Sequence, residues 1–146
     1  ISMASPTKEQ ERAILQRFMK EEPLETLQSV CTREDILALQ KQAKQIYIHP
    51  VLLDYMIDLV PATRSWPNID MGVCPRGSLA LVRAVRAYAL VRGGAYVVPE
   101  DIKTVAVPVL AHRLQLSGSV GSTDAQKKTM TDVLSSLPLP TEDWSK

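Results

Sequence analysis

The feature that most constrains this chain is residues 71–92, where a proline precedes a long apolar run. Pro75 has a fixed φ and no backbone N–H, so it fits the first turn of a helix and biases Cys74 before it toward an extended conformation. The apolar residues from Leu79 to Val91 are spread around most of the helical surface. We therefore predict a central, mostly buried helix that begins at this proline.

Arg76 lies in the first turn of this predicted helix, where a cation opposes the helix dipole at a cost of about 0.3–1 kcal/mol. Arg83 falls on the same stripe of the helix, because the residues step by 100°. An arginine beside exposed N–H groups can bind an anionic group such as a phosphate. The other interpretation is a structural ion pair with Asp70. On the residues alone the ion pair is favoured, because structural ion pairs outnumber functional ones.

Helix start signals recur along the whole chain. Capping-box patterns predict starts at three threonines: Thr7, Thr32 and Thr123. Prolines in the first turn predict two more starts: Pro50 and Pro99. Gly93 and Gly94 are expected to end the central helix. Pro108 is expected to bend or break the helix that starts at Pro99, leaving 112–113 on a terminal turn.

Apolar residues recur at helical spacing after each of these starts. The predicted apolar faces comprise Ile14, Leu15, Phe18 and Met19; Ile36, Leu39, Ala43, Ile46 and Tyr47; Leu52, Leu53, Tyr55, Met56, Leu59 and Val60; Ile102, Val105, Ala106, Val109 and Leu110; and Met130, Val133, Leu134 and Leu137. No segment has sustained β alternation, and the one short extended piece is expected at 96–98. The predicted fold class is all-α, a helical bundle.

Two loops interrupt the helical pattern. Residues 63–72 are polar and carry proline and glycine, so a ligand or partner could reach the chain there. Arg64 and Trp66 stand out in this loop. Trp66 either covers the edge of the core or makes such a contact, and the residues leave both readings open. Residues 117–122 alternate serine with glycine and valine and predict a flexible linker.

Composition excludes several function classes. The chain has 146 residues, 45% of them hydrophobic and 23% charged, which is ordinary for one soluble domain. A net charge of +1 gives no electrostatic footprint for nucleic acid. No apolar run approaches the roughly 20 residues that span a bilayer. We expect a cytoplasmic protein that binds neither nucleic acid nor membrane.

The chain also lacks recognisable catalytic or metal-binding patterns. Cys31 and Cys74 are too few for a disulfide framework and are expected to be free thiols. His49 and His112 have no metal-ligand spacing, and His49 is expected to mark a helix boundary. The sequence contains no phosphate-binding loop, zinc-protease motif or nucleophile elbow.

Four separated stretches nevertheless share the order and spacing of a known family: 54–64, 72–83, 96–102 and 109–114. They resemble the C-terminal part of MoxR-family AAA+ ATPases, in the magnesium-chelatase-like clade. The resemblance covers nearly the whole chain and ends in a short helix followed by Pro-Leu-Pro at 138–140. It implies a helical lid domain over 7–140, with 1–6 as the end of a linker from an ATPase core that precedes Ile1. Residues 141–146 are expected to be a mobile tail.

The resemblance also implies roles for named residues. In this family the Gly-x-x-Pro-Arg stretch carries a sensor arginine that reaches the γ-phosphate of ATP and couples hydrolysis to lid movement. Arg76 is the matching residue, with Gly72 and Pro75 in the same nucleotide-binding stretch. The intact parent is then expected to use ATP and Mg²⁺. The fragment alone is expected to hold no cofactor and not to be an enzyme, because one arginine cannot replace a phosphate loop.

For the intact parent, the resemblance implies a ring, expected to be a hexamer, in which Arg76 serves the nucleotide of its own or a neighbouring subunit. Its partners are then its own ATPase core, the neighbouring subunits and von Willebrand factor A domain proteins, which it remodels as a chaperone does. An alternative is a stand-alone helical interaction module that holds an acidic partner with the 64–70 loop and the stripe of Arg76 and Arg83. A helix-turn-helix nucleic-acid binder is disfavoured by the near-neutral charge.

Three positions depart from the family pattern. Cys74 stands where serine or alanine is usual, Gly94-Ala95 replaces Arg-Asp, and Val98 replaces a hydroxyl residue before Pro99. The first leaves the position of Arg76 intact. The other two are expected to weaken a surface ion pair and a helix cap, the lost cap costing about 1 kcal/mol.

Overall fold

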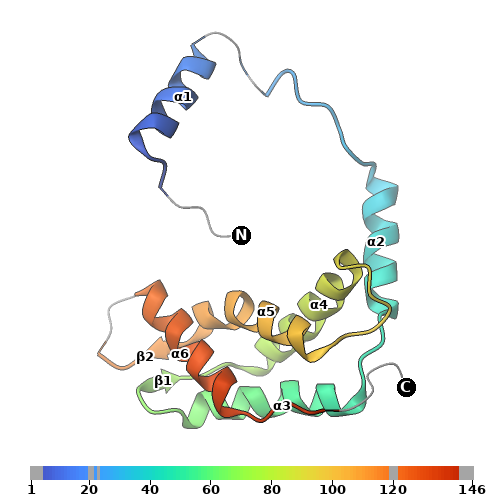
Figure 1. The fold of residues 1–146 in the computed structure, drawn as a ribbon, viewed down its shortest axis with the longest axis vertical. Helices are drawn as coiled ribbons and strands as arrows, with labels where there is room; N and C mark the ends of the chain where they lie inside the picture. The colour runs from blue at the N-terminus through green and yellow to red at the C-terminus, as the bar shows by residue number, and fades with distance from the viewer. Residues whose placement is uncertain (1–4, 20–21, 23, 119–121, 142–146) are drawn as a thin grey trace. The chain divides into compact units, whose positions relative to one another are not determined.

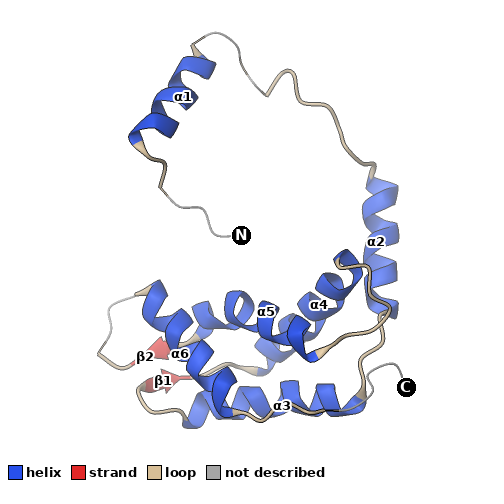
Figure 2. Ribbon diagram, in the orientation of Figure 1, coloured by secondary structure: helices blue, strands red, loops and turns tan. Residues whose placement is uncertain are grey.

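The structure is a computed structural model that describes residues 5–19, 22, 24–118 and 122–141. Its described part contains six α-helices, one 3₁₀ helix and two short strands (Figures 1 and 2). The helices are α1 (Lys8–Phe18), α2 (Arg33–Gln45), α3 (Pro50–Ser65), α4 (Pro75–Val91), α5 (Pro99–Leu110), η1 (Ala111–Arg113) and α6 (Thr123–Ser136), and the strands are β1 (Ile69–Met71) and β2 (Gln115–Leu116). The predicted all-α fold class is confirmed.

The chain divides into two compact units, Ile1–Leu37 and Ala38–Lys146, and the boundary falls within α2. In the first unit, α1 begins with the predicted capping box. The Thr7 hydroxyl accepts the Gln10 N–H at 3.3 Å, and the Gln10 side chain accepts the Thr7 N–H at 2.8 Å. The expected apolar face of α1 is exposed: Ile14, Leu15, Phe18 and Met19.

The predicted box at the start of α2 also forms. The Asp35 carboxylate accepts the Thr32 N–H at 2.8 Å, and the Thr32 hydroxyl accepts the Asp35 N–H at 3.1 Å. The Thr32 hydroxyl also donates to the Asp35 carboxylate at 2.8 Å. The two hydrogen bonds that the carboxylate accepts, the one from the Thr32 backbone first, lower the pKa of Asp35 below its ordinary value. Both helix starts in this region are therefore set by local hydrogen bonds that the sequence makes visible.

The second unit has a core built from α3, α4, α5 and α6. Its fully buried large side chains include Leu52, Met56, Leu59, Leu81, Ile102, Leu110, Met130 and Val133. The His49 ring accepts the Val51 N–H at 3.3 Å, which confirms that His49 marks the start of α3. Leu53 was expected on the buried face, but it is 39% exposed. It lies 100° around the helix from Leu52, beyond the edge of the stripe that faces the core.

The central helix α4 was expected to be mostly buried, and this prediction is wrong. Only one stripe of it is buried, at a spacing of four residues: Gly77, Leu81, Val85 and Ala89. Leu79 and Tyr88 are exposed, and Val91 is 85% exposed. The reason is that α3 and α5, which pack against α4, bury only this stripe. As predicted, Gly93 ends the helix, at φ 81°, and the Gly94 N–H donates to the Ala89 carbonyl at 2.8 Å.

Strands β1 and β2 were not predicted. They form an antiparallel pair in which Ile69 lies opposite Leu116. Each strand is too short to show the alternation that identifies a strand in a sequence. The expected extended piece at 96–98 is present, because Tyr96 forms an isolated parallel bridge with Tyr47. The two strands connect the segment before α4 to the segment before α6.

The end of the chain follows the prediction with one correction. Pro108 lies inside α5, which ends two residues later at Leu110, and 112–113 lie on the 3₁₀ turn η1, as expected. The predicted capping box at Thr123 is wrong. The N-cap of α6 is Ser122, and the Gln126 side chain instead donates to the Leu114 carbonyl at 2.8 Å. The linker residues 119–121 and the tail residues 142–146 lie outside the described residues.

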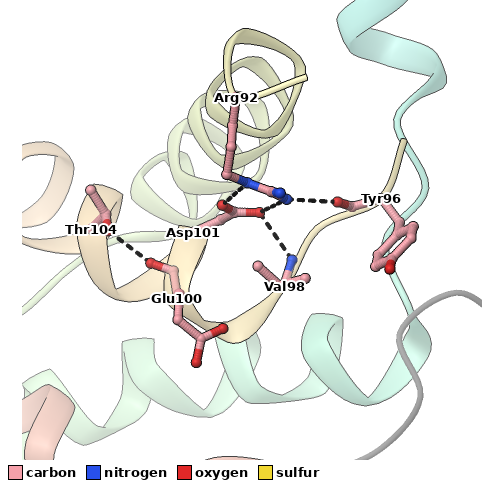
Figure 3. Close-up of polar contacts among 6 residues, drawn as sticks. All are labelled: Arg92, Tyr96, Val98, Glu100, Asp101 and Thr104. Carbon is pink, nitrogen blue, oxygen red and sulfur yellow. Dashed lines mark hydrogen bonds and ion pairs between the residues drawn. The ribbon is translucent and has the colours of Figure 1, made fainter. Parts of the chain in front are cut away.

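An ion pair fixes the corner between α4 and α5 (Figure 3). Arg92 donates from Nε and Nη2 to the two carboxylate oxygens of Asp101, at 2.8 and 3.0 Å. Asp101 is only 1% exposed, and it also accepts the Val98 N–H at 3.0 Å. Arg92 donates further to the Tyr96 carbonyl at 3.3 Å. The pair raises the pKa of Arg92. The carboxylate thus makes one half of a capping box, and Val98 has no side-chain oxygen to make the other half.

We predict that Arg92→Met lowers the free energy of unfolding by about 2 kcal/mol, because it leaves a buried carboxylate without its charged partner. Urea unfolding monitored by circular dichroism measures the change. Lys128→Met, which removes an exposed cation from α6, is the control and should unfold at the wild-type midpoint. Equal midpoints for Arg92→Met and Lys128→Met would show that the pair contributes nothing.

Candidate functional site

Arg76 is exposed in the first turn of α4, next to Pro75, which occupies the first helical position as predicted. Among the described residues, no ion pair or side-chain hydrogen bond holds its guanidinium. The alternative pairing with Asp70 is not formed, since Asp70 instead accepts a hydrogen bond from the Ser117 hydroxyl. The guanidinium is therefore available to a ligand.

The start of α4 is held by the end of α3. The Thr63 hydroxyl, which is fully buried, accepts the Val73 N–H at 2.9 Å and donates to the Val60 carbonyl at 2.7 Å. Arg64 Nε donates to the Val73 carbonyl at 2.9 Å. Both backbone polar groups of the buried Val73 are thus satisfied by two consecutive residues of α3. We call the contacts of Val73 with Thr63 and Arg64 the clamp. Val73 lies three residues before Arg76, so the clamp fixes the position of the first turn of α4.

This clamp changes the interpretation of the 63–72 loop. Thr63 and Arg64 lie within α3 rather than in the loop, and Arg64 has a structural partner in Val73. Trp66 is the C-cap residue of α3 and packs against the core while half-buried. Of the two readings of Trp66, the structure supports the cover over the edge of the core.

Two glycines permit the close packing around this clamp. A Cβ added to Gly72 would lie 2.8 Å from both the backbone nitrogen and Cγ of Arg64. A Cβ added to Gly77 would lie 2.3 Å from Cγ1 of Val73, which is fully buried. Gly72 therefore lets the chain pass close to α3, and Gly77 lets the first turn of α4 rest on Val73. Both glycines position Arg76 through packing.

Cys74, the N-cap residue of α4, is an exposed free thiol, as is Cys31, in agreement with the sequence prediction. The backbone N–H groups of Gly77 and Arg76 lower the pKa of the Cys74 thiol, and the charge of Arg113 adds to this effect. The same N–H groups and charge that favour a thiolate favour any other anion at this place.

Arg113 was missed as a residue near the site. It lies on η1, and its Nε donates to the Val109 carbonyl at 3.3 Å. The Cβ built on Gly77 would lie 3.4 Å from its Cδ, so its side chain runs beside the first turn of α4. In the sequence, the one indication of Arg113 was that it belongs to 109–114, the last of the four stretches that resemble the MoxR family. Neither spacing nor composition connects η1 to α4.

The described residues do not indicate a metal site or a membrane-spanning helix. They contain no group of three or more histidine, cysteine or acidic side chains that could hold a metal ion. Within the same residues, each helix is either too short or too polar to cross a membrane. The start of α4 is therefore the strongest candidate site for an anionic ligand.

Comparison with known proteins decides the family. The family model described as the AAA lid domain matches residues 61–135, which include the clamp, α4, α5 and most of α6. The chain belongs to the AAA lid domain family. The lid is 36% identical over 126 residues to Chaperone MoxR1 of Mycobacterium tuberculosis, covering 80% of this chain and 33% of that protein. The MoxR-type AAA+ lid predicted from the sequence is confirmed.

Two further similarities cover almost the whole lid chain. It is 32% identical over 143 residues to the uncharacterised protein YeaC of Bacillus subtilis, covering 97% of this chain and 45% of that protein. A solved structure of a candidate ATPase from Cytophaga hutchinsonii has a TM-score of 0.77 at 24% identity, and the match covers 95% of this chain and 45% of that one. This second likeness shows the fold alone. The chain spans less than half the length of these relatives.

We predict that Gly77→Ala destabilises the lid by at least about 1 kcal/mol. The added methyl group would overlap Val73, and the cost of such overpacking exceeds the gain in helix propensity, which is about 1 kcal/mol or less. Urea unfolding gives the change in free energy. Ser78→Ala, the neighbouring small change in the same turn, is the control and should stay near the wild type. A Gly77→Ala lid as stable as the control would contradict the close contact.

The lowered pKa of Cys74 predicts its reactivity. In a Cys31→Ser background, the rate of alkylation by iodoacetamide should reach half its maximum at a lower pH in the folded lid than in the unfolded chain, because the folded lid stabilises the thiolate. As the pH falls through the lowered pKa, the thiol is protonated and the rate declines. In urea the midpoint should return to the ordinary value. The same midpoint in the folded and unfolded chains would contradict the helix-terminus effect.

Proposed function

We propose that this chain is the lid of a MoxR-type AAA+ ATPase and that Arg76 contacts the γ-phosphate of ATP bound to the nucleotide-binding core. One observation carries the proposal. Arg76 is exposed and without a partner among the described residues, in a helix turn whose N–H groups already favour an anion. The match to the AAA lid domain model, which includes Arg76, supports the same role.

The chemistry of arginine suits this role. Its guanidinium is planar and always charged, and it matches the geometry of phosphate oxygens better than an ammonium group does. Charge is redistributed over the γ-phosphate oxygens during transfer, and a fixed cation stabilises that distribution. Once the phosphate has left, the contact is lost. Because the clamp fixes Arg76 relative to α3, this loss would release the lid domain as a body.

The remaining machinery belongs to the core in this proposal. The core supplies the phosphate-binding loop and the Mg²⁺ ligands, and the chain contributes Arg76, with Gly72 and Pro75 holding its turn in place. Residues 7–140 act as the lid and 1–6 as the end of the linker from the core. The lid alone neither binds ATP tightly nor hydrolyses it, since one arginine cannot replace those parts.

The relative named Chaperone MoxR1 supports the proposal that the parent remodels other proteins as a chaperone does. A cytoplasmic location is part of the same proposal. We propose a hexameric ring, in which the core, the neighbouring subunits and von Willebrand factor A domain proteins are the partners. This step rests on the family and not on the chemistry of the described residues.

Arg76→Ala in the full-length parent tests the role of the arginine. We expect ATP turnover to fall by about 10²-fold or more, with nucleotide still bound, because the contact acts mainly on the transferring phosphate. Turnover and nucleotide affinity are measured beside the wild type and Lys128→Ala, which removes an exposed cation of α6. Turnover unchanged in Arg76→Ala would leave the residue without a catalytic role and favour the interaction-module alternative.

Mixed rings then show whether Arg76 acts on the nucleotide of its own subunit or on that of a neighbouring subunit. Subunits that carry Arg76→Ala are mixed with subunits whose phosphate-binding loop is inactivated. If Arg76 serves a neighbour, mixing restores part of the turnover, because an intact arginine then meets an intact nucleotide site. If Arg76 serves its own subunit, the mixture stays as inactive as its components.

A further inference from the structure

A groove of about 490 Å³ lies between the C-terminal half of α2 and the middle of α4. It is lined by Gln40, Ala43, Lys44, Arg83, Arg86 and Ala87, all of which belong to the second unit. Neither the clamp nor Arg76 lines it. Arg83 lies seven residues after Arg76, which places it about 10 Å farther along the helix. The groove is therefore separate from the candidate phosphate contact.

The charged residues that line this groove are all positive. Three of its lining residues are cations, Lys44, Arg83 and Arg86, and none is an acid. The two chain segments that border it, residues 38–45 and helix α4, contain no aspartate or glutamate at all. The whole chain has a net charge of only +1. Because the lining contains cations and no acid, it favours a ligand with negative charge.

Arg86 gives a second and independent indication of a missing ligand. Its Nε is buried, and it has no hydrogen-bond partner among the described residues. Buried polar groups in proteins are almost always paired, and a charged donor without a partner is especially costly. If the side chain turned to bring Nε to the groove, a carboxylate there would pair with the guanidinium in the fork geometry that arginine and carboxylates share. The described residues of the lid provide no acceptor for Arg86 Nε.

We propose that this groove binds an acidic segment of a partner polypeptide. The two alanines, Ala43 and Ala87, leave room for a chain to approach α2 and α4 closely, while the cations at the walls receive its carboxylates. A nucleic acid fits less well, because no aromatic side chain lines the groove for base stacking and the chain is close to neutral. This inference does not depend on the role of Arg76.

The test uses the full 146-residue chain and a fluorescein-labelled peptide of alternating glutamate and alanine, with a glutamine and alanine peptide as the uncharged control. Fluorescence anisotropy measures binding at several salt concentrations. We expect the glutamate peptide to bind and the glutamine peptide not to bind. The affinity for the glutamate peptide should decrease as salt increases, because charge pairs at an open groove are screened.

Two matched variants locate the binding. Arg83→Glu should weaken binding at least about tenfold, whereas Lys128→Glu, with the same change in net charge on α6, should change it less than about twofold. Arg86→Lys keeps the charge but removes the buried Nε, and it should weaken binding by about three- to tenfold. Circular dichroism establishes that each variant is folded before its affinity is read.

Three results would overturn the proposal. The first is that the glutamate peptide does not bind at low salt. The second is equal weakening by Arg83→Glu and Lys128→Glu, which would indicate general attraction to the net charge. The third is that a single-stranded oligonucleotide binds in an Arg83-dependent manner and displaces the peptide at a lower concentration than the peptide itself requires, which would assign the groove to nucleic acid.

Discussion

The backbone of Val73 is the point on which the arrangement of this lid depends. The Thr63 hydroxyl accepts its N–H and Arg64 donates to its carbonyl, so one buried residue joins the end of α3 to the start of α4. Gly77 can rest on Val73 only because it has no side chain. The direction of α4, and with it the place of Arg76 and of the basic groove, follows from this junction.

A second junction, at the other end of α4, shows how the chain compensates for a weak helix start. Val98 has no side-chain oxygen to cap α5, and the sequence alone predicts a loss of about 1 kcal/mol there. The Asp101 carboxylate instead accepts the Val98 N–H, which is the other half of a capping box, and it is held in place by Arg92 (Figure 3). The N–H of Asp101, which a hydroxyl at position 98 would cap, donates to the Val98 carbonyl at 3.0 Å. The ion pair thus stabilises the start of α5 without taking the place of the hydroxyl.

The sequence predicted the helices because their starts are local. Thr7, Thr32, Pro50, Pro75 and Pro99 act within one turn, and each begins or caps a helix in the structure. What could not be predicted depends on distant neighbours. The burial of α4 is set by which helices reach it, and the strand pair joins segments far apart in the chain. For the same reason Arg76 was identified within its own helix, whereas Arg113 beside it and the groove with Arg86 were not.

The pairing of β1 with β2 also has a consequence for the order in which the lid is made. Ile69 lies opposite Leu116, so the segment that leads into α4 gains its strand partner only after nearly fifty more residues have left the ribosome. Contacts between such distant segments form late, since a long loop must close first. A nascent chain that stops before Leu116 would therefore contain Arg76 in a helix but lack the strand pair beside its first turn. The strand pair next to the start of α4 is thus completed after α1 to α5 have been made, with only α6 still to follow.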